Sequence, residues 1–180
     1  KNLKPNELLI LIDGGATCGV VPSKEYCTNI RKVNKYIKVG GNDKTNNILK
    51  VEYEGMFTFS QVINNKETRI TTTVRSVDDF DVVIIPECLF LKKNMKVIKD
   101  DKVLSVISKS DNKPILNGYA NVFENTWLFY CKVTLHNFIT ETDETYNIRE
   151  LLCDSYDYKD YSYFLRDAKF EDKLFSLLPY

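Results

Sequence analysis

The first two-thirds of the chain is a series of short apolar runs, each about the length of a β-strand, separated by turn-forming residues. Leu8 to Ile12 is one such run, and it ends at Asp13-Gly14-Gly15, a strong turn signal. Ile48 to Phe59 alternates between apolar and polar side chains, as a half-buried strand does. Further strands are predicted at 16–21, 36–39, 68–77 and 82–85, with turns at 40–43 and 64–66. This pattern predicts a mainly β fold.

Helical signals in this part of the chain are short. Pro86 suits the first turn of a helix, and Glu87 to Lys93 follows it with apolar faces. Val97 to Ile107 is predicted to be a hairpin that turns at 99–101. The polar stretch from Lys109 to Pro114 then indicates a boundary, so we expect a β domain over residues 1–112.

Residues 113–180 are predicted to be a C-terminal α+β extension. Its first part, 115–135, has the pattern of a β-hairpin with its turn at Glu124-Asn125. Two helices are predicted after the hairpin, at 146–153 and 168–178. Because the apolar side chains of this segment need a surface on which to bury, we expect a lobe or an arm that packs on the β domain.

Composition narrows the classes of function. The 180 residues include 25 basic and 25 acidic side chains, so the formal net charge is zero. Surfaces that bind nucleic acids or anionic membranes need a local excess of Lys and Arg, so we expect no direct nucleic-acid partner and no membrane. The apolar runs are too short to span a bilayer and the start has no signal-peptide pattern, which favours a cytoplasmic location.

The five cysteines and the single histidine do not form a metal-ligand pattern. The cysteines are scattered without a C-x-x-C pair, which predicts free thiols in a reducing compartment and no metal or other cofactor. Asp78, Asp79 and Asp81 form an acidic cluster that we interpret as a solvated loop rather than a metal site. Cys131 and His136 lack an orienting partner, which disfavours a Cys–His nucleophile.

The segment from Leu11 to Thr17, Leu-Ile-Asp-Gly-Gly-Ala-Thr, has the form that a catalytic carboxylate needs. Aspartic proteases hydrolyse peptides with two carboxylates that share one proton and activate a water molecule. Such a carboxylate needs a rigid support and a backbone that can approach the substrate, which a preceding apolar strand and following glycines provide. Asp13 is the only credible catalytic carboxylate in the chain. The same residues also fit a plain type I′ hairpin turn at Asp13-Gly14.

The order of these features resembles the protease segment of retroviral and LTR-retrotransposon polyproteins, most closely the Ty3/gypsy-like type. That retropepsin-like family has an apolar run, Asp-Ser/Thr-Gly-Ala, a flap hairpin, a long β ribbon, and a late apolar run followed by a short helix. The similar segments here are 8–17, 39–48, 49–77 and 81–94, and the resemblance covers about residues 5–108. It implies one subunit of a closed β barrel with the acid-protease fold.

The resemblance also implies a function. It is that of a homodimeric aspartic endopeptidase that cleaves a retroelement polyprotein, in the cytoplasm or within retroelement particles. Each subunit would contribute one Asp13 to a site on the two-fold axis. Gly15 and Ala16 would line the substrate cleft, and the hairpin at Gly40-Gly41 would close over an extended peptide as a flap.

Two departures from the family pattern leave other interpretations open. Gly14 stands where the family has Ser or Thr, whose hydroxyl links the two active-site loops. Pro86 stands where the family has Gly, so a bond donated by that backbone N–H is lost. Weak activity is therefore one expectation. One alternative is a degenerate or domesticated retropepsin fold that serves as a dimerisation or binding module, and another is a monomeric structural β domain without protease ancestry.

Overall fold

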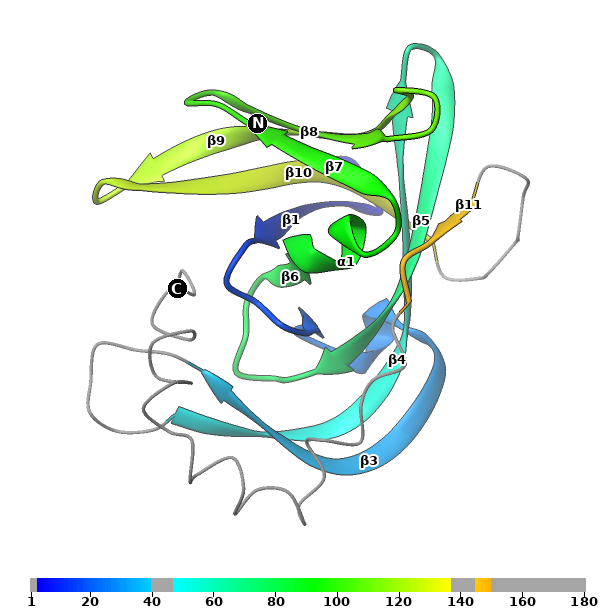
Figure 1. Cartoon of the computed structure of the whole chain (residues 1–180). Helices are drawn as coiled ribbons and strands as arrows, with labels where there is room; N and C mark the ends of the chain where they lie inside the picture. The colour runs from blue at the N-terminus through cyan, green and yellow to red at the C-terminus, as the bar shows by residue number, and fades with distance from the viewer. Residues whose placement is uncertain (1–2, 40–46, 137–144, 150–180) are drawn as a thin grey trace.

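The computed structural model describes residues 3–39, 47–136 and 145–149, and within these ranges it consists mainly of β-strands (Figure 1). Eleven strands form one sheet. Their bounds are β1 Glu7–Asp13, β2 Gly19–Val21, β3 Thr28–Val39, β4 Asn47–Ile63, β5 Lys66–Ser76, β6 Val83–Pro86, β7 Met95–Lys99, β8 Val103–Ser108, β9 Pro114–Phe123, β10 Thr126–His136 and β11 Thr145–Asn147. Helical structure in the described ranges is limited to the 3-10 turn η1 (Lys24–Tyr26) and the short helix α1 (Glu87–Leu91). The predicted mainly β class is confirmed.

The two most apolar strands, β1 and β6, lie at the centre of the sheet. Ile10 and Ile12 of β1 pack in the main hydrophobic core, whereas Leu11 between them packs in a smaller second cluster on the other face. β6 behaves in the same way, with Ile85 in the main core and Ile84 in the second cluster. Burial on both faces explains why these segments are continuous apolar runs rather than alternating ones.

The order of the central strands brings one loop to a defined edge. β6 lies between β1 and β2, although β1 and β2 follow one another in the chain. β1 runs parallel to β6, with Asp13 opposite Pro86, and β2 runs antiparallel to β6. The connection 14–18 therefore passes the carboxyl end of β6, where α1 begins, so Asp13 and the first residue of α1 lie at the same edge.

A further pairing joins distant parts of the sheet. β10 pairs with β1 along most of its length and also with β4, through Thr134 opposite Ser60 and His136 opposite Thr58. The pairings β4–β5–β2–β6–β1–β10–β4 thus form a circuit of six strands. The main core contains large side chains from this circuit, such as Phe57, Phe59 and Phe129, together with side chains from α1 and β7 to β9.

Two predicted turns are confirmed by their backbone geometry. Asn64 and Asn65 join β4 to β5, and Glu124 and Asn125 join β9 to β10, all four with positive φ. Two consecutive residues with positive φ are typical of type I′ hairpin turns, and Asn accepts this conformation more readily than most residues. The resulting β4–β5 hairpin is the long ribbon that rises on the right of Figure 1.

The segment after residue 112 begins with the predicted hairpin, but this hairpin is part of the sheet. β10 lies between β1 and β9, and its residues Phe129, Cys131 and Val133 are buried in the main core. The sheet therefore continues across the boundary that the polar stretch indicates. These apolar side chains complete the core from within instead of covering it from outside.

The helix predicted to begin at residue 146 is wrong at its start. Thr145–Asn147 is strand β11, which pairs in parallel with β5. Ile148 follows β11 and is fully buried in the main core, and its N–H donates to the carbonyl of Thr71. Backbone pairing with an open stretch of β5 thus overrides the local helical pattern. The predicted helix 168–178 lies outside the described residues.

Candidate active site

Asp13 is the last residue of β1 and is almost completely buried, with 5% of its surface exposed. The interpretation of Asp13-Gly14 as a type I′ hairpin turn is wrong for two reasons. β1 and β2 are not paired with each other, because β6 lies between them. Neither Asp13 nor Gly14 has the positive φ that this turn requires. The Asp-Gly-Gly sequence therefore serves a loop that crosses the end of a neighbouring strand.

The two oxygens of the Asp13 carboxylate have different surroundings. Oδ1 accepts a hydrogen bond of 2.8 Å from the backbone N–H of Gly15. Oδ2 is buried and has no hydrogen-bond partner within the described part of the chain. Burial raises the pKa of this carboxyl group, against the opposing effect of the backbone N–H groups of Gly15 and Ala16. A buried acceptor without a partner is costly in free energy, so this oxygen calls for a structural or functional explanation.

An ion pair lies beside Asp13. Glu87 at the start of α1 pairs with Lys99 at the end of β7, and the ammonium of Lys99 lies 5.3 Å from the centre of the Phe129 ring. Lys99 lowers the pKa of Asp13 and Glu87 raises it, both as smaller effects than burial. A β-carbon on Gly14 would lie 3.1 Å from Oε2 of Glu87. The carboxylate of Glu87 thus lies directly beside Gly14.

The other predicted site residues are distributed unequally around Asp13. Gly15 is partly buried and holds Oδ1 through its backbone. Ala16 is buried, and it packs in the second hydrophobic cluster. Gly14 and Thr17 are the exposed residues of this loop. The predicted flap residues Gly40 and Gly41 lie outside the described residues.

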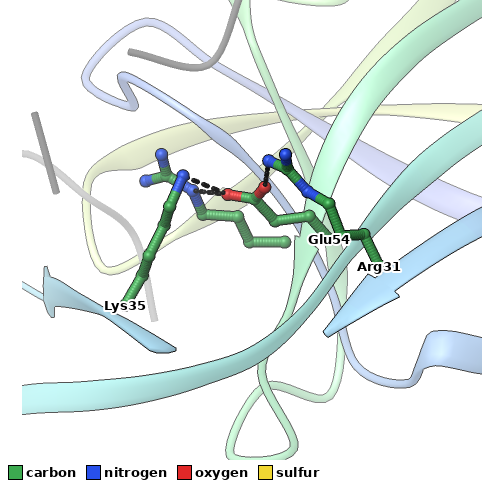
Figure 2. A network of polar contacts seen from close by, with 4 residues as sticks. Arg31, Lys35 and Glu54 are labelled. Carbon is green, nitrogen blue, oxygen red and sulfur yellow. Dashed lines mark hydrogen bonds and ion pairs between the residues drawn. The ribbon is translucent and has the colours of Figure 1, made fainter. Parts of the chain in front are cut away.

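A second polar cluster, which sequence reasoning missed, supports the far end of the same loop. Arg31 on β3, Glu54 on β4 and Arg75 on β5 lie opposite one another in register. Glu54 Oε2 lies 2.7 Å from Arg31 Nη2, and Oε1 lies 2.9 Å from Lys35 Nζ and 3.5 Å from Arg75 Nε (Figure 2). Arg75 also interacts with Cys18, the last residue of the loop before β2.

This ion cluster is buried and strongly coupled. Glu54, Lys35 and Arg75 are each at most 3% exposed. Burial by itself would raise the pKa of Glu54, but hydrogen bonds from Arg31 and Lys35 and the charges of Lys35 and Arg75 lower it overall. A signal for the cluster was present in the sequence, because Arg75 interrupts the otherwise uncharged stretch 70–77. The strand β3 begins at Thr28 instead of the predicted residue 36. The charged side chains at its start, such as Arg31, have partners on β4, so this segment can form a strand.

The competing candidates do not assemble a site. His136 contacts Ser60 at 2.7 Å and Glu67 at 3.4 Å, whereas Cys131 is buried in the core, where burial raises its pKa to about 12. A thiol with such a pKa is not a nucleophile near neutral pH. The acidic residues Asp78, Asp79 and Asp81 are exposed, which fits the interpretation as a solvated loop. Cys18, Cys27 and Cys131 are free thiols, and the Cys88 thiol donates to the carbonyl of Ala16 at 3.9 Å.

Among the described residues, no group of three or more His, Cys, Asp and Glu side chains is arranged to hold a metal ion. In the same ranges no helix has both the length and the apolar character needed to cross a membrane. No protein-family model, no curated protein and no solved structure matches this chain.

Proposed function

We propose that this protein is an aspartic endopeptidase of the retropepsin type, which acts as a homodimer and uses one Asp13 from each subunit. The observation that carries the proposal is the state of Asp13. It is buried at the end of a central strand, one oxygen is fixed by the Gly15 N–H, and the other has no partner within the described ranges. A second Asp13 across a two-fold axis would supply the missing partner.

The chemistry follows from bringing two such carboxylates together. Two neighbouring carboxylates cannot both ionise easily, so the pair keeps one shared proton. The ionised member takes a proton from a water molecule, which attacks the peptide carbonyl, while the protonated member donates to the substrate. The raised pKa of Asp13 in the single chain already favours retention of that proton. The hydrogen bond from Gly15 orients the carboxylate without occupying its second oxygen.

The arrangement of strands supports the same proposal. The order of elements is an apolar strand ending in Asp13, the β3–β4 hairpin, the long β4–β5 ribbon, and β6 followed at once by a short helix. This order is the one that the resemblance to retropepsins implies, and the circuit of six strands is compatible with a closed barrel. The proposal includes a retropepsin-like barrel, a flap at Gly40-Gly41 and a substrate-binding role of Gly15 and Ala16. It also includes a retroelement polyprotein as the substrate and a location in the cytoplasm or in retroelement particles.

The test is cleavage of a peptide library and of unfolded polypeptide by the purified full chain, compared with Asp13→Asn. The substitution keeps the shape of the side chain but removes the base, so cleavage should fall by at least about a hundredfold. Asp79→Asn is the matched control, because Asp79 is exposed and lies outside the site. Cleavage that survives Asp13→Asn contradicts the proposal, as does inhibition by thiol or metal reagents alone.

A second candidate function is a non-catalytic retropepsin fold that serves as a dimerisation or binding module. The Glu87–Lys99 pair favours it, because an ammonium and a second carboxylate already lie beside Asp13 within one chain. The same experiment separates the two functions. A folded dimer that cleaves no peptide, and that Asp13→Asn leaves unchanged in every binding property, is the result that the second candidate predicts.

A further inference from the structure

The β9–β10 hairpin extends past the end of β1 that carries Asp13. The pairing of β1 with β10 ends at Ile12 opposite Phe129, so residues 126–128 of β10 lie beyond it. On the other side, the pairing of β8 with β9 ends at Val103 opposite Tyr119. Leu128 is still buried in the second hydrophobic cluster, so the part that projects is residues 121–127, a two-stranded arm that reaches about 7 Å, since two strand residues span roughly that length. Figure 1 shows this arm reaching well beyond the arrowhead of β1.

The tip of this arm exposes apolar side chains on both of its faces. Val122 lies opposite Trp127 in the pairing, so these two share one face, and Phe123 points to the other face. Val122 is 52% exposed, Phe123 is 60% exposed and Trp127 is 49% exposed. Glu124 is the only charged residue between 119 and 131. A hairpin whose strands carry no charge and expose apolar side chains on both faces is typical of an interaction element rather than of a solvated turn.

The backbone of the arm is also available for pairing. The N–H of Ala120 still donates to the carbonyl of Lys102. Over residues 121–127 the two strands pair with each other but, among the described residues, with no further strand along their outer edges. Open edges with apolar side chains associate readily with another strand. Charged or proline residues that would block such association are absent from both strands of the tip, 121–123 and 126–127.

We propose that this arm, residues 121–127, is the element through which two copies of the chain associate, with the arm of each copy packed against the other. The inference rests on the proposed function, which requires a second Asp13 near the first. The second copy is the favoured occupant because the arm projects beyond the strand end that carries Asp13. A two-fold axis near that end brings the arm of one subunit against the partner. Such an interface is isologous, so one substitution changes both sides of it.

The test is the concentration dependence of dimer formation, measured by sedimentation of the full chain. Val122→Asp places a charge on the arm and should raise the dimer dissociation constant by about tenfold or more, because two unpaired charges would be buried. Val62→Asp is the matched control, since Val62 is 69% exposed near the tip of another hairpin, β4–β5. A second variant, in which 122–127 is replaced by a shorter Asn-Gly turn, removes the arm itself. Thermal unfolding verifies that each variant is folded.

The possible outcomes separate the dimerisation role of the arm from the proposed peptidase function. Dissociation by Val122→Asp and by the shortened hairpin, with Val62→Asp unchanged, supports the arm even if the wild-type chain cleaves nothing. A dimer that survives both arm variants overturns the inference, and it leaves the proposed function intact if cleavage still depends on Asp13. A chain that stays monomeric at all concentrations also overturns the inference. Binding of an unrelated protein to the arm, without dimer formation, would also overturn the inference.

Discussion

Glu87 and Gly14 are in close contact: a β-carbon on Gly14 would lie 3.1 Å from Oε2 of Glu87. Glu87 directly follows Pro86, which pairs in register with Asp13, so this contact is a consequence of how β1 and β6 are aligned. A Ser or Thr at position 14, as in retropepsins, would move the flexible end of Glu87 by a few tenths of an ångström. Position 14 therefore lies directly beside the Glu87–Lys99 ion pair.

The two members of this ion pair should change the pKa of Asp13 in opposite directions. Lys99→Met removes a positive charge that favours the carboxylate, so the pKa of Asp13 should rise further. Glu87→Gln removes a negative charge that disfavours the carboxylate, so the pKa should fall. Carbon-detected NMR titration of the Asp13 carboxyl measures both changes. Lys93→Met, at an exposed position, is the control, and shifts of the same sign in the two test variants would contradict this electrostatic account.

Asp13→Asn should stabilise the folded chain at neutral pH. The folded-state pKa of Asp13 is raised, so the stability that its protonated form provides is fully present below the ordinary carboxyl pKa and is lost as pH rises through the folded-state value. The variant carries no charge at this site, so it should gain on the order of 1 kcal/mol in the free energy of unfolding at pH 7. Below the ordinary carboxyl pKa the difference should vanish. Urea unfolding at a series of pH values measures this difference, and a variant that is less stable than wild type at pH 7 would contradict the expected cost of burying the Asp13 carboxylate.

Glu54→Gln should destabilise the chain strongly. Glu54 is the carboxylate of the buried ion cluster, so its loss leaves Lys35 and Arg75 without that partner and should cost about 3 kcal/mol or more. Glu52→Gln on the same strand is a matched control, because Glu52 is 54% exposed and its pair with Lys50 contributes little. Denaturant unfolding should show a large effect only for Glu54.

The pH dependence of this cluster has the opposite sign to that of Asp13. The folded-state pKa of Glu54 is lowered, so its contribution is fully present above the ordinary carboxyl pKa and is lost as pH falls through the folded-state value. The destabilisation caused by Glu54→Gln should therefore shrink in acid. An effect that stays constant down to the lowest pH would show that packing, and not charge, is responsible.

The local elements of this fold could be predicted from sequence, but the long-range pairings could not. Leu8 to Ile12, the 82–85 run and the turns at Asn64-Asn65 and Glu124-Asn125 have strong local patterns, and these segments form as predicted. The position of β10 beside β1 depends on contacts between residues more than a hundred positions apart, which no local pattern encodes. The polar stretch before it therefore predicts a domain boundary where the sheet in fact continues.

The candidate site shows the same division. Asp13 stands out because an apolar run ends at an acid followed by glycines. Glu87 and Lys99 could not be assigned to the site from the sequence. They reach Asp13 from distant parts of the chain, through the register of β1 with β6 and through the short helix α1. The buried Glu54 cluster was also missed, because charged residues on strands normally indicate an exposed face. Here three strands place charges of opposite sign in register instead.

Mixing the wild-type chain with the Asp13→Asn variant should lower the peptidase activity per wild-type chain if the active site is shared between two subunits, because mixed dimers would be inactive. With equal amounts and free exchange, only about one quarter of the dimers would contain two Asp13 residues, so activity per wild-type chain should fall to about one half. A larger excess of Asp13→Asn should bring it close to zero. An enzyme that uses only its own Asp13 would keep full activity at every ratio.

The control for this mixing experiment is the double variant Asp13→Asn/Val122→Asp. It carries the same inactive site, but the added charge on the arm should prevent it from pairing with wild-type chains. Activity should therefore remain close to that of wild type alone when this variant is added in excess. A loss of activity with the double variant as strong as with Asp13→Asn would mean that the subunits meet through another surface, while still supporting a site made from two chains.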